Sequence, residues 1–300
     1  MLKWFLRTIW AALASVAFLL WWIWREEALW QSLAGFWVPA LLYATIIGLE
    51  CAMAAAVNRG DDSPRAGPAD WTGVWMREIL VSLKVFGWYL PIRPGAVADQ
   101  MTRTGAATTG VVFIHGFMCN RGIWTPWMEA LRAEGRIFAA VTLEPVRGPI
   151  DAYVATIEEA VQRVTDATGR PPILVCHSMG GLAARAWLCT GGAESLMRIR
   201  HVITVGTPHQ GTWLARFAWA PNARQMRRQS PWLRELTSVE PRGLAAQFTC
   251  WYSNCDNIVF PPSTATLAGA DNRLAPCLGH VELTANERVM GSCLDLIRAS

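Results

Sequence analysis

The sequence predicts an α/β fold, with a mainly parallel sheet of about six strands flanked by helices and a hydrophobic helical hairpin in front of it. Three observations predict this arrangement. After residue 110, short apolar runs alternate with stretches of helical period. One run, Ile173–Val175, leads through a turn of small residues around Ser178 directly into a helix. Before residue 58, two long segments carry no charged side chain.

Residues 1–58 are expected to form a membrane anchor. Residues 8–24 and 28–49 lack charged side chains, and each segment has the roughly 17–25 residues that a helix needs to cross a bilayer. Only the turn Arg25-Glu26-Glu27 separates them, and the tryptophans around it suit an interfacial belt: Trp21, Trp22, Trp24 and Trp30. We therefore expect two transmembrane helices. A signal peptide is the alternative for the first, although bulky residues stand where cleavage needs small ones.

The basic residues near these segments indicate a topology. Lys3 and Arg7 precede the first span, Arg59 and Arg65 follow the second, and the turn offers only Arg25. The positive-inside rule then favours a main domain that faces the cytoplasm. With two spans, we expect a multi-pass protein of a bacterial-type inner membrane. The net charge of +4 is too small and too scattered to indicate nucleic acid binding, and it suits an anionic membrane surface. The sequence does not indicate an oligomeric state.

The eight cysteines do not form a recognisable metal site. No Cys-x-x-Cys pair occurs, and Cys250 and Cys255 are spaced unlike the ligands of zinc sites, so no bound metal is expected. Reduced thiols are the expectation in a cytoplasm. A Cys250–Cys255 disulfide is expected only if the topology is inverted.

Residues 59–109 are expected to be a linker followed by an amphipathic helix. The linker, residues 58–70, is polar and rich in glycine and proline, and Pro91 and Pro94 end the helix predicted at 71–89. Its apolar positions recur about once per turn: Trp75, Ile79, Leu80, Leu83 and Phe86. Two placements are open, against the protein's own domain and on the membrane surface.

Residues 110–300 are expected to form the main domain. Apolar runs predict its strands, at residues 111–114, 137–141, 173–175, 202–205, 248–252 and near 265–267. Strands that alternate with helices indicate a parallel sheet with right-handed crossovers. The stretch 212–243 breaks the alternation with a mixture of aromatic and arginine residues, which predicts a lid suited to contact with lipid. A plain pair of surface helices is the alternative.

The segment Cys176-His177-Ser178-Met179-Gly180 has the context of a nucleophile elbow, a sharp turn between a strand and a helix. Small residues two positions before and after the serine permit the turn, which exposes the Ser178 hydroxyl at the end of the sheet. Cys176 stands where the G-x-S-x-G pattern has its first glycine. The alternative is a turn in which the serine only caps the helix.

A nucleophilic serine needs a base, and the base needs an acid that orients it. Four of the five histidines occupy positions that suit this role poorly: His115 in a strand-end turn, His177 directly before the serine, where the elbow should point it elsewhere, His201 at a strand start and His209 in a glycine-containing loop. His280, in a loop before the last helix, is the candidate base. Asp256 follows the fifth strand directly, where active sites of open α/β sheets gather. It is the candidate acid, and Asp271 is the alternative.

An oxyanion hole should complete such a site. The Met179 N–H follows the nucleophile, and the turn His115-Gly116-Phe117 places a second amide after the first strand. We therefore expect the Met179 and Phe117 N–H groups to be the two donors, the loss of either of which typically lowers the rate by about 10²–10³-fold.

These segments together resemble the triacylglycerol lipase and esterase branch of the α/β-hydrolase superfamily. The matching segments appear in family order over about residues 110–298: Phe113–Phe117, Cys176–Leu182, Val205–His209, the Asp256 loop and Gly279-His280. The resemblance implies the α/β-hydrolase fold and ester hydrolysis through a Ser-His-Asp triad, without a metal or organic cofactor. The hydrophobic hairpin lies outside the resemblance.

The function expected from the sequence is that of a membrane-anchored serine hydrolase acting on lipid or other apolar acyl esters. Ser178 would attack the carbonyl, His280 would carry the proton, Asp256 would orient the imidazole, and water would resolve the acyl-enzyme. The lipid preference follows from the anchor alone, because anchoring concentrates the enzyme at bilayer substrates. An acyltransferase or thioesterase with the same triad is the alternative, followed by a non-catalytic membrane scaffold.

Overall fold

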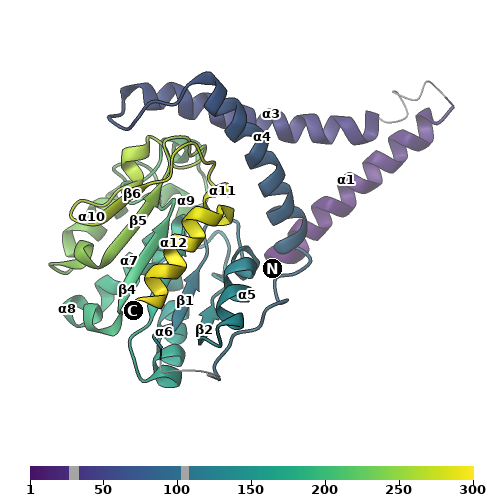
Figure 1. Cartoon of the computed structure of the whole chain (residues 1–300). Helices are drawn as coiled ribbons and strands as arrows, with labels where there is room; N and C mark the ends of the chain where they lie inside the picture. The colour runs from purple at the N-terminus through teal and green to yellow at the C-terminus, as the bar shows by residue number, and fades with distance from the viewer. Residues whose placement is uncertain (27–33, 103–107) are drawn as a thin grey trace.

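The computed structural model describes residues 1–26, 34–102 and 108–300, and its centre is a sheet of parallel strands in the order β2-β1-β3-β4-β5-β6 (Figure 1). The bounds are β1 Val111–Ile114, β2 Phe138–Ala140, β3 Ile173–His177, β4 His201–Val205, β5 Phe248–Tyr252 and β6 Asp271–Leu274. Because every strand runs in the same direction, their carboxyl ends lie along one edge of the sheet.

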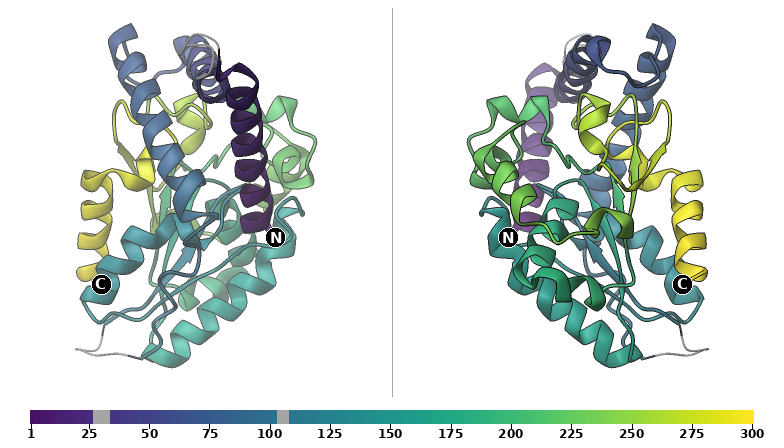
Figure 2. Two further views of the ribbon diagram at one scale, coloured as in Figure 1. Left: turned by 90° about the vertical axis from the view of Figure 1, so that its right-hand side faces the viewer. Right: turned by 90° about the vertical axis from the view of Figure 1, so that its left-hand side faces the viewer.

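Helices cover both faces of the sheet, which is why the inner strands are apolar throughout. In β1, Val112 and Ile114 belong to the apolar cluster that includes α6 (Val154–Thr168) and α7 (Met179–Thr190). Val111 and Phe113 point to the other cluster, with α5 (Thr125–Ala133) and α12 (Glu287–Arg298). Figure 2 shows α12 and α6 on opposite sides of the sheet. The predicted fold class is confirmed.

The sixth strand differs from the prediction. β6 comprises Asp271–Leu274, whereas Ala265, where the strand was expected, ends the 3₁₀ helix η8 (Pro262–Ala265). β6 is an edge strand paired only with β5 in the described chain, and Asp271 and Asn272 are exposed. An exposed edge needs no apolar run, so hydrophobicity could not reveal this strand.

Two N-terminal helices, α1 (Leu2–Trp24) and α3 (Ala34–Val57), extend beyond the sheet domain (Figure 1). By length and composition alone, Leu2–Trp24 and Trp37–Gly60 could cross a membrane, and only 11% and 17% of their most apolar windows are buried. Glu27 of the expected turn and Trp30 of the expected interfacial belt lie outside the described residues.

The predicted amphipathic helix packs on the protein itself. α4 (Pro68–Lys84) begins three residues early, with Asp70 accepting the Gly67 N–H at 2.8 Å, and continues as the π-helix η2 (Val85–Tyr89). Three of its five predicted apolar positions, Trp75, Ile79 and Phe86, are half-buried and pack against the protein. The buried positions are Val74, Glu78 and Ser82, whereas Leu80 is 68% exposed. Because two of these three buried residues are polar or charged, hydrophobicity alone could not identify the buried face of the helix.

Residues 212–243 contain short helices that pack partly beside α7: η6 (Trp213–Phe217), α9 (Pro221–Gln225) and α10 (Pro231–Val239). Leu233 and Leu236 of α10 are buried, whereas Phe217 and Trp219 are exposed. The remaining short helices are η1 (Asn58–Gly60), η3 (Arg121–Trp124), η4 (Ile150–Tyr153), α8 (Gly192–Ser195), η5 (Leu196–Arg198), η7 (Leu244–Gln247) and α11 (Glu282–Ala285).

Candidate active site

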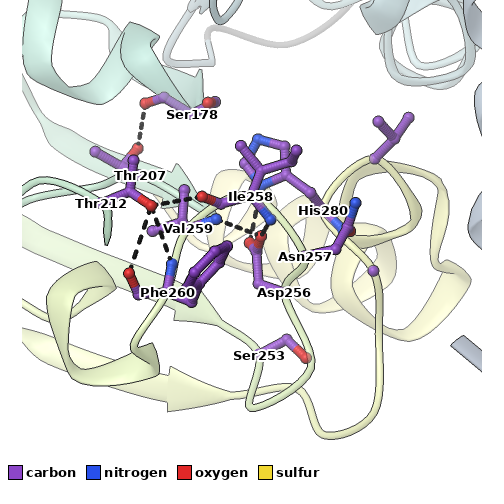
Figure 3. Close-up of polar contacts among 12 residues, drawn as sticks. Ser178, Thr207, Thr212, Ser253, Asp256, Asn257, Ile258, Val259, Phe260 and His280 are labelled. Atoms are coloured by element: carbon purple, nitrogen blue, oxygen red, sulfur yellow. Dashed lines mark hydrogen bonds and ion pairs between the residues drawn. The ribbon is translucent and has the colours of Figure 1, made fainter. Parts of the chain in front are cut away.

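Ser178 occupies a strained turn between β3 and α7. Its φ of 53° and ψ of −129° lie in a region that residues with side chains rarely adopt. The turn is held by neighbours: the Ser178 N–H donates to Val205 O at 2.9 Å, and Thr207 Oγ1 donates to Ser178 O at 2.9 Å (Figure 3). Gly116 lies so close that a Cβ there would be 2.6 Å from Ser178 Cβ. Strain at a residue locked by its surroundings is typical of functional sites.

His280 and Asp256 form a buried pair. His280 Nδ1 lies 2.8 Å from Asp256 Oδ2, and their side chains are 7% and 2% exposed. Asp256 Oδ1 accepts the N–H groups of Ile258 at 2.9 Å and Val259 at 2.7 Å, so the carboxylate is fixed by three hydrogen bonds (Figure 3). The alternative acid, Asp271, lies in β6 and bonds to Arg273, away from His280.

The surroundings of His280 favour its protonated form. Burial acts to lower the pKa of the imidazole, but the charge and hydrogen bond of Asp256 outweigh it, and Glu78 and Glu50 add to the increase. The pKa of His280 is therefore raised above its ordinary value. Such a group is a stronger base than a free imidazole, and it is neutral only above the raised pKa.

The described chain contains no hydrogen bond between Ser178 Oγ and His280. The end of β4 nevertheless connects Ser178 with the Asp256–His280 pair (Figure 3): Val205 O accepts the Ser178 N–H, and a Cβ on the next residue, Gly206, would lie 3.3 Å from both Asp256 Oδ2 and His280 Nδ1. Catalytic hydrogen bonds are often long before substrate binds, so this geometry is compatible with proton transfer.

The two candidate oxyanion donors lie in the turns that follow β1 and β3. Phe117 lies in the turn after β1, and Met179 is the first residue of α7, where N–H groups lack partners within the helix. In the described part of the chain, neither N–H is paired with an acceptor. Gly116, between β1 and Phe117, is in contact with Ser178, so the Phe117 amide lies near the candidate nucleophile.

Three of the other histidines serve the structure. His115 Nε2 accepts the Leu143 N–H at 2.9 Å, His209 Nε2 lies 3.1 Å from Thr204 Oγ1, and His201 Nε2 lies 2.9 Å from Thr249 Oγ1. Burial lowers the pKa of His115 to about 4 and that of His209 well below its ordinary value. Both are therefore neutral and unsuited to proton transfer near neutral pH.

His177 differs from its expected position. It packs on His280 with ring centroids 4.7 Å apart, and its Nε2 lies 3.3 Å from His280 O. The elbow therefore points this side chain under the candidate base rather than away from it. Burial holds the pKa of His177 well below its ordinary value, so it adds no positive charge beside His280.

The sequence reasoning also missed Asn257, Glu50 and Glu78. Asn257 Oδ1 accepts the His280 N–H at 3.0 Å, and its Nδ2 donates to Glu50 Oε2 at 2.8 Å. Glu78 accepts two N–H groups directly after His280. A charged residue four positions from both Val74 and Ser82, in one helical stripe, was the available signal for Glu78.

An open groove lies elsewhere in the described structure. It has a volume of about 700 Å³ and runs between α3 and the start of α4, where Trp71, Trp75, Arg59 and Arg65 line it. Asn254 brings it to the loop that carries Asp256, but Ser178 is not among its lining residues.

Residues 111–289 match the model of the Alpha/beta hydrolase family. No curated protein sequence matches the chain significantly. Among solved structures, the mature Bacillus licheniformis lipase BlEst2 is similar with a TM-score of 0.57 at 18% identity, over 64% of this chain and 93% of that one. Its propeptide form has a TM-score of 0.57 at 17% identity, over 67% and 52%. The Aspergillus fumigatus lipase B has a TM-score of 0.45 at 17% identity, over 57% and 42%. The likeness to BlEst2 bears on the fold alone.

Proposed function

The chain belongs to the alpha/beta hydrolase family, and from this membership we propose that it is a membrane-anchored serine hydrolase that cleaves carboxylic esters. The single observation that carries the proposal is the pairing of His280 Nδ1 with a fully hydrogen-bonded Asp256, on the sheet edge where Ser178 adopts a strained turn. A serine at positive φ, a buried imidazole and an orienting carboxylate are the parts that acyl transfer requires.

The proposed reaction proceeds through an acyl-enzyme. His280 Nε2 takes the proton of Ser178 Oγ as the oxygen attacks the ester carbonyl, and the negative charge that develops on the carbonyl oxygen is stabilised by the Phe117 and Met179 N–H groups. His280 then gives the proton to the leaving alcohol. Water, activated by the same imidazole, attacks the acyl group and releases the acid and free Ser178. Asp256 keeps Nδ1 protonated and oriented throughout.

Anchoring in a bilayer, multi-pass and with the hydrolase domain on the cytoplasmic side, is the second part of the proposal. Exposed apolar residues on both N-terminal helices support it, such as Phe18 and Trp22 of α1 and Leu41 of α3, because a water-soluble domain rarely exposes so many. An enzyme held at the membrane meets esters dissolved in it at high local concentration. We therefore propose lipid or other apolar acyl esters as the substrate class, with residues 212–243 as a lid that contacts lipid.

The first experiment is labelling of detergent-solubilised protein with a fluorophosphonate probe, followed by mass spectrometry of the modified peptide. We expect wild type to be labelled on Ser178, and S178A and H280A to lose the signal. S292A, which removes a half-buried hydroxyl of α12, is the matched control and should be labelled like wild type. Wild type unlabelled in native-like lipid would refute a serine nucleophile and favour a non-catalytic scaffold.

A second experiment separates hydrolysis from acyl transfer. A panel of p-nitrophenyl esters graded by acyl length is assayed with and without a competing alcohol or thiol acceptor. Release of free acid that an acceptor does not divert supports an esterase, and quantitative diversion to the acceptor indicates an acyltransferase. Retention of the protein in membranes after carbonate washing tests the anchor, and its release into the wash would refute integral insertion.

A further inference from the structure

The loop that carries His280 is held by a carboxylate from outside the family match. Glu78 lies on α4 and is 1% exposed. Its Oε1 accepts the Val281 N–H at 2.8 Å, and its Oε2 accepts the Glu282 N–H at 2.9 Å. Gly279 packs against this carboxylate so closely that a Cβ there would lie 2.7 Å from Glu78 Cδ. One side chain thus contacts the backbone immediately before and after His280.

The four consecutive N–H groups of this loop all have side-chain acceptors. Besides the two bonds to Glu78, Gly279 donates to Glu282 Oε2 at 3.0 Å and His280 donates to Asn257 Oδ1 at 3.0 Å. Asn257 is in turn oriented by Glu50 of α3. Helices α3 and α4 therefore both reach the backbone of the candidate base, α3 through Asn257 and α4 directly.

A carboxylate is a costly way to hold a loop in the interior. Burying a charged group is unfavourable unless hydrogen bonds compensate it, and burial raises the pKa of Glu78 to about 7 despite the two N–H groups that favour its charged form. A glutamine could supply only one amide oxygen, and its NH₂ group would oppose the second N–H. Only a carboxylate accepts both bonds, and it also adds negative charge near His280.

We propose that Glu78 is a positioning residue for His280, with Glu50 acting in the same way through Asn257, so that the helices preceding the hydrolase domain form part of its active site. The proposal rests on the proposed function, since it assigns Glu78 a task only if His280 is the base. Glu78 touches no reacting atom. It fixes the backbone next to His280, and its charge favours the protonated form that the imidazole adopts during the reaction.

The pH dependence of this site involves several groups. The titratable and charged side chains that face Glu78 or His280 are, from the elements packed around them, Tyr43, Glu50 and Cys51 of α3, Arg77 of α4, His177 of β3, Asp256, and Glu282 of α11. Since Glu78 and His280 interact, the acid limb of the reaction belongs to the coupled pair.

The test is the rate of fluorophosphonate labelling of Ser178 as a function of pH, with thermal unfolding measured beside it. In E78Q we expect the acid limb to move to lower pH, because removing the charge lowers the pKa of His280. The plateau rate should fall about tenfold or more, because one N–H loses its acceptor. E78D keeps the charge and should return the limb toward wild type. E129Q neutralises an exposed glutamate of α5 that has no polar contacts in the described chain, and it should leave the acid limb and the plateau rate unchanged.

The outcomes separate the two proposals. Unlabelled wild type refutes the proposed function itself. Labelled wild type with an unmoved acid limb in E78Q refutes the positioning role, even if the protein becomes less stable, because a purely structural contact does not shift the limb. Should E78Q fail to fold, E50Q and E50A provide the test. E50Q keeps an oxygen acceptor for Asn257 and E50A does not, so labelling should be several-fold slower in E50A than in E50Q, and equal rates would overturn the proposal.

Discussion

Replacing Gly116 with alanine should inactivate the site by displacing Ser178, the proposed nucleophile. An added Cβ would lie 2.6 Å from Ser178 Cβ, 3.1 Å from His177 O and 3.2 Å from Ser178 Oγ. Carbon atoms in contact are about 3.5–4.0 Å apart, so the two carbons must separate by about 1 Å. All three contacted atoms belong to the elbow, which already holds Ser178 in a strained conformation and has little room to move.

A misplacement of about 1 Å at a reacting group costs about 10²-fold in rate, and overpacking a buried site typically costs about 1–3 kcal/mol of stability. We therefore expect G116A to lower the rate of fluorophosphonate labelling about 100-fold while unfolding at a modestly lower temperature. The two effects are separable, because labelling is measured at a temperature where both proteins are folded.

The matched control is G291A in α12, where an added Cβ meets no atom within 4 Å. It should label like wild type and gain about 0.5–1 kcal/mol, as alanine is the better helix former. Labelling of G116A within threefold of wild type, with circular dichroism showing a folded protein, would refute the claim that Gly116 fixes the nucleophile's position.

Two further predictions concern pH and stability. In D256N, the loss of negative charge should lower the pKa of His280, so the acid limb of labelling moves to lower pH while the plateau falls about 10⁴-fold; an unmoved limb would contradict the pairing. Because the pKa of His280 is raised in the folded protein, the pair contributes its full stabilisation below about pH 6.5, and this contribution is lost as pH rises through the folded pKa. The free energy of unfolding of D256N, measured with urea, should therefore increase less toward acid pH than that of wild type. In R185M, Glu240 loses the buried guanidinium 2.5 Å away, which should lower the free energy of unfolding by about 3 kcal/mol; a loss under 1 kcal/mol would show that the ion pair contributes little.

Local sequence pattern was sufficient to predict the parts of this fold that are apolar or strained. Strands buried on both faces read as continuous hydrophobic runs, which placed β1, β3 and β4, and the turn at Ser178 needs small residues that the sequence displays. β6 escaped because an edge strand carries no such signal. The family resemblance added the order in which these segments follow one another.

The side chains that contact the His280 loop could not be found in this way. Glu50 and Glu78 lie more than 200 positions from the groups they bond, and no periodicity relates them to the loop. His177 was misjudged for a related reason. Alternation along a strand places it opposite its neighbours, but only the fold shows that the His280 loop passes over that face.

The boundary near residue 110 is therefore a boundary of sequence resemblance and not of interactions. The preceding segment also supports the other side of the site: Asn120, three residues after Phe117, donates to Leu90 O at 3.0 Å, just after η2. α1 contacts that same region through Trp10, whose Nε1 donates to Phe86 O at 3.1 Å. Thus α3 and α4 hold the loop of the candidate base, while α1 and η2 contact the segment next to the turn that carries the Phe117 amide. A force that separates α1 from α3 would therefore reach the site from both sides. If the proposed anchoring holds, insertion in a bilayer and competence of the site should be energetically linked.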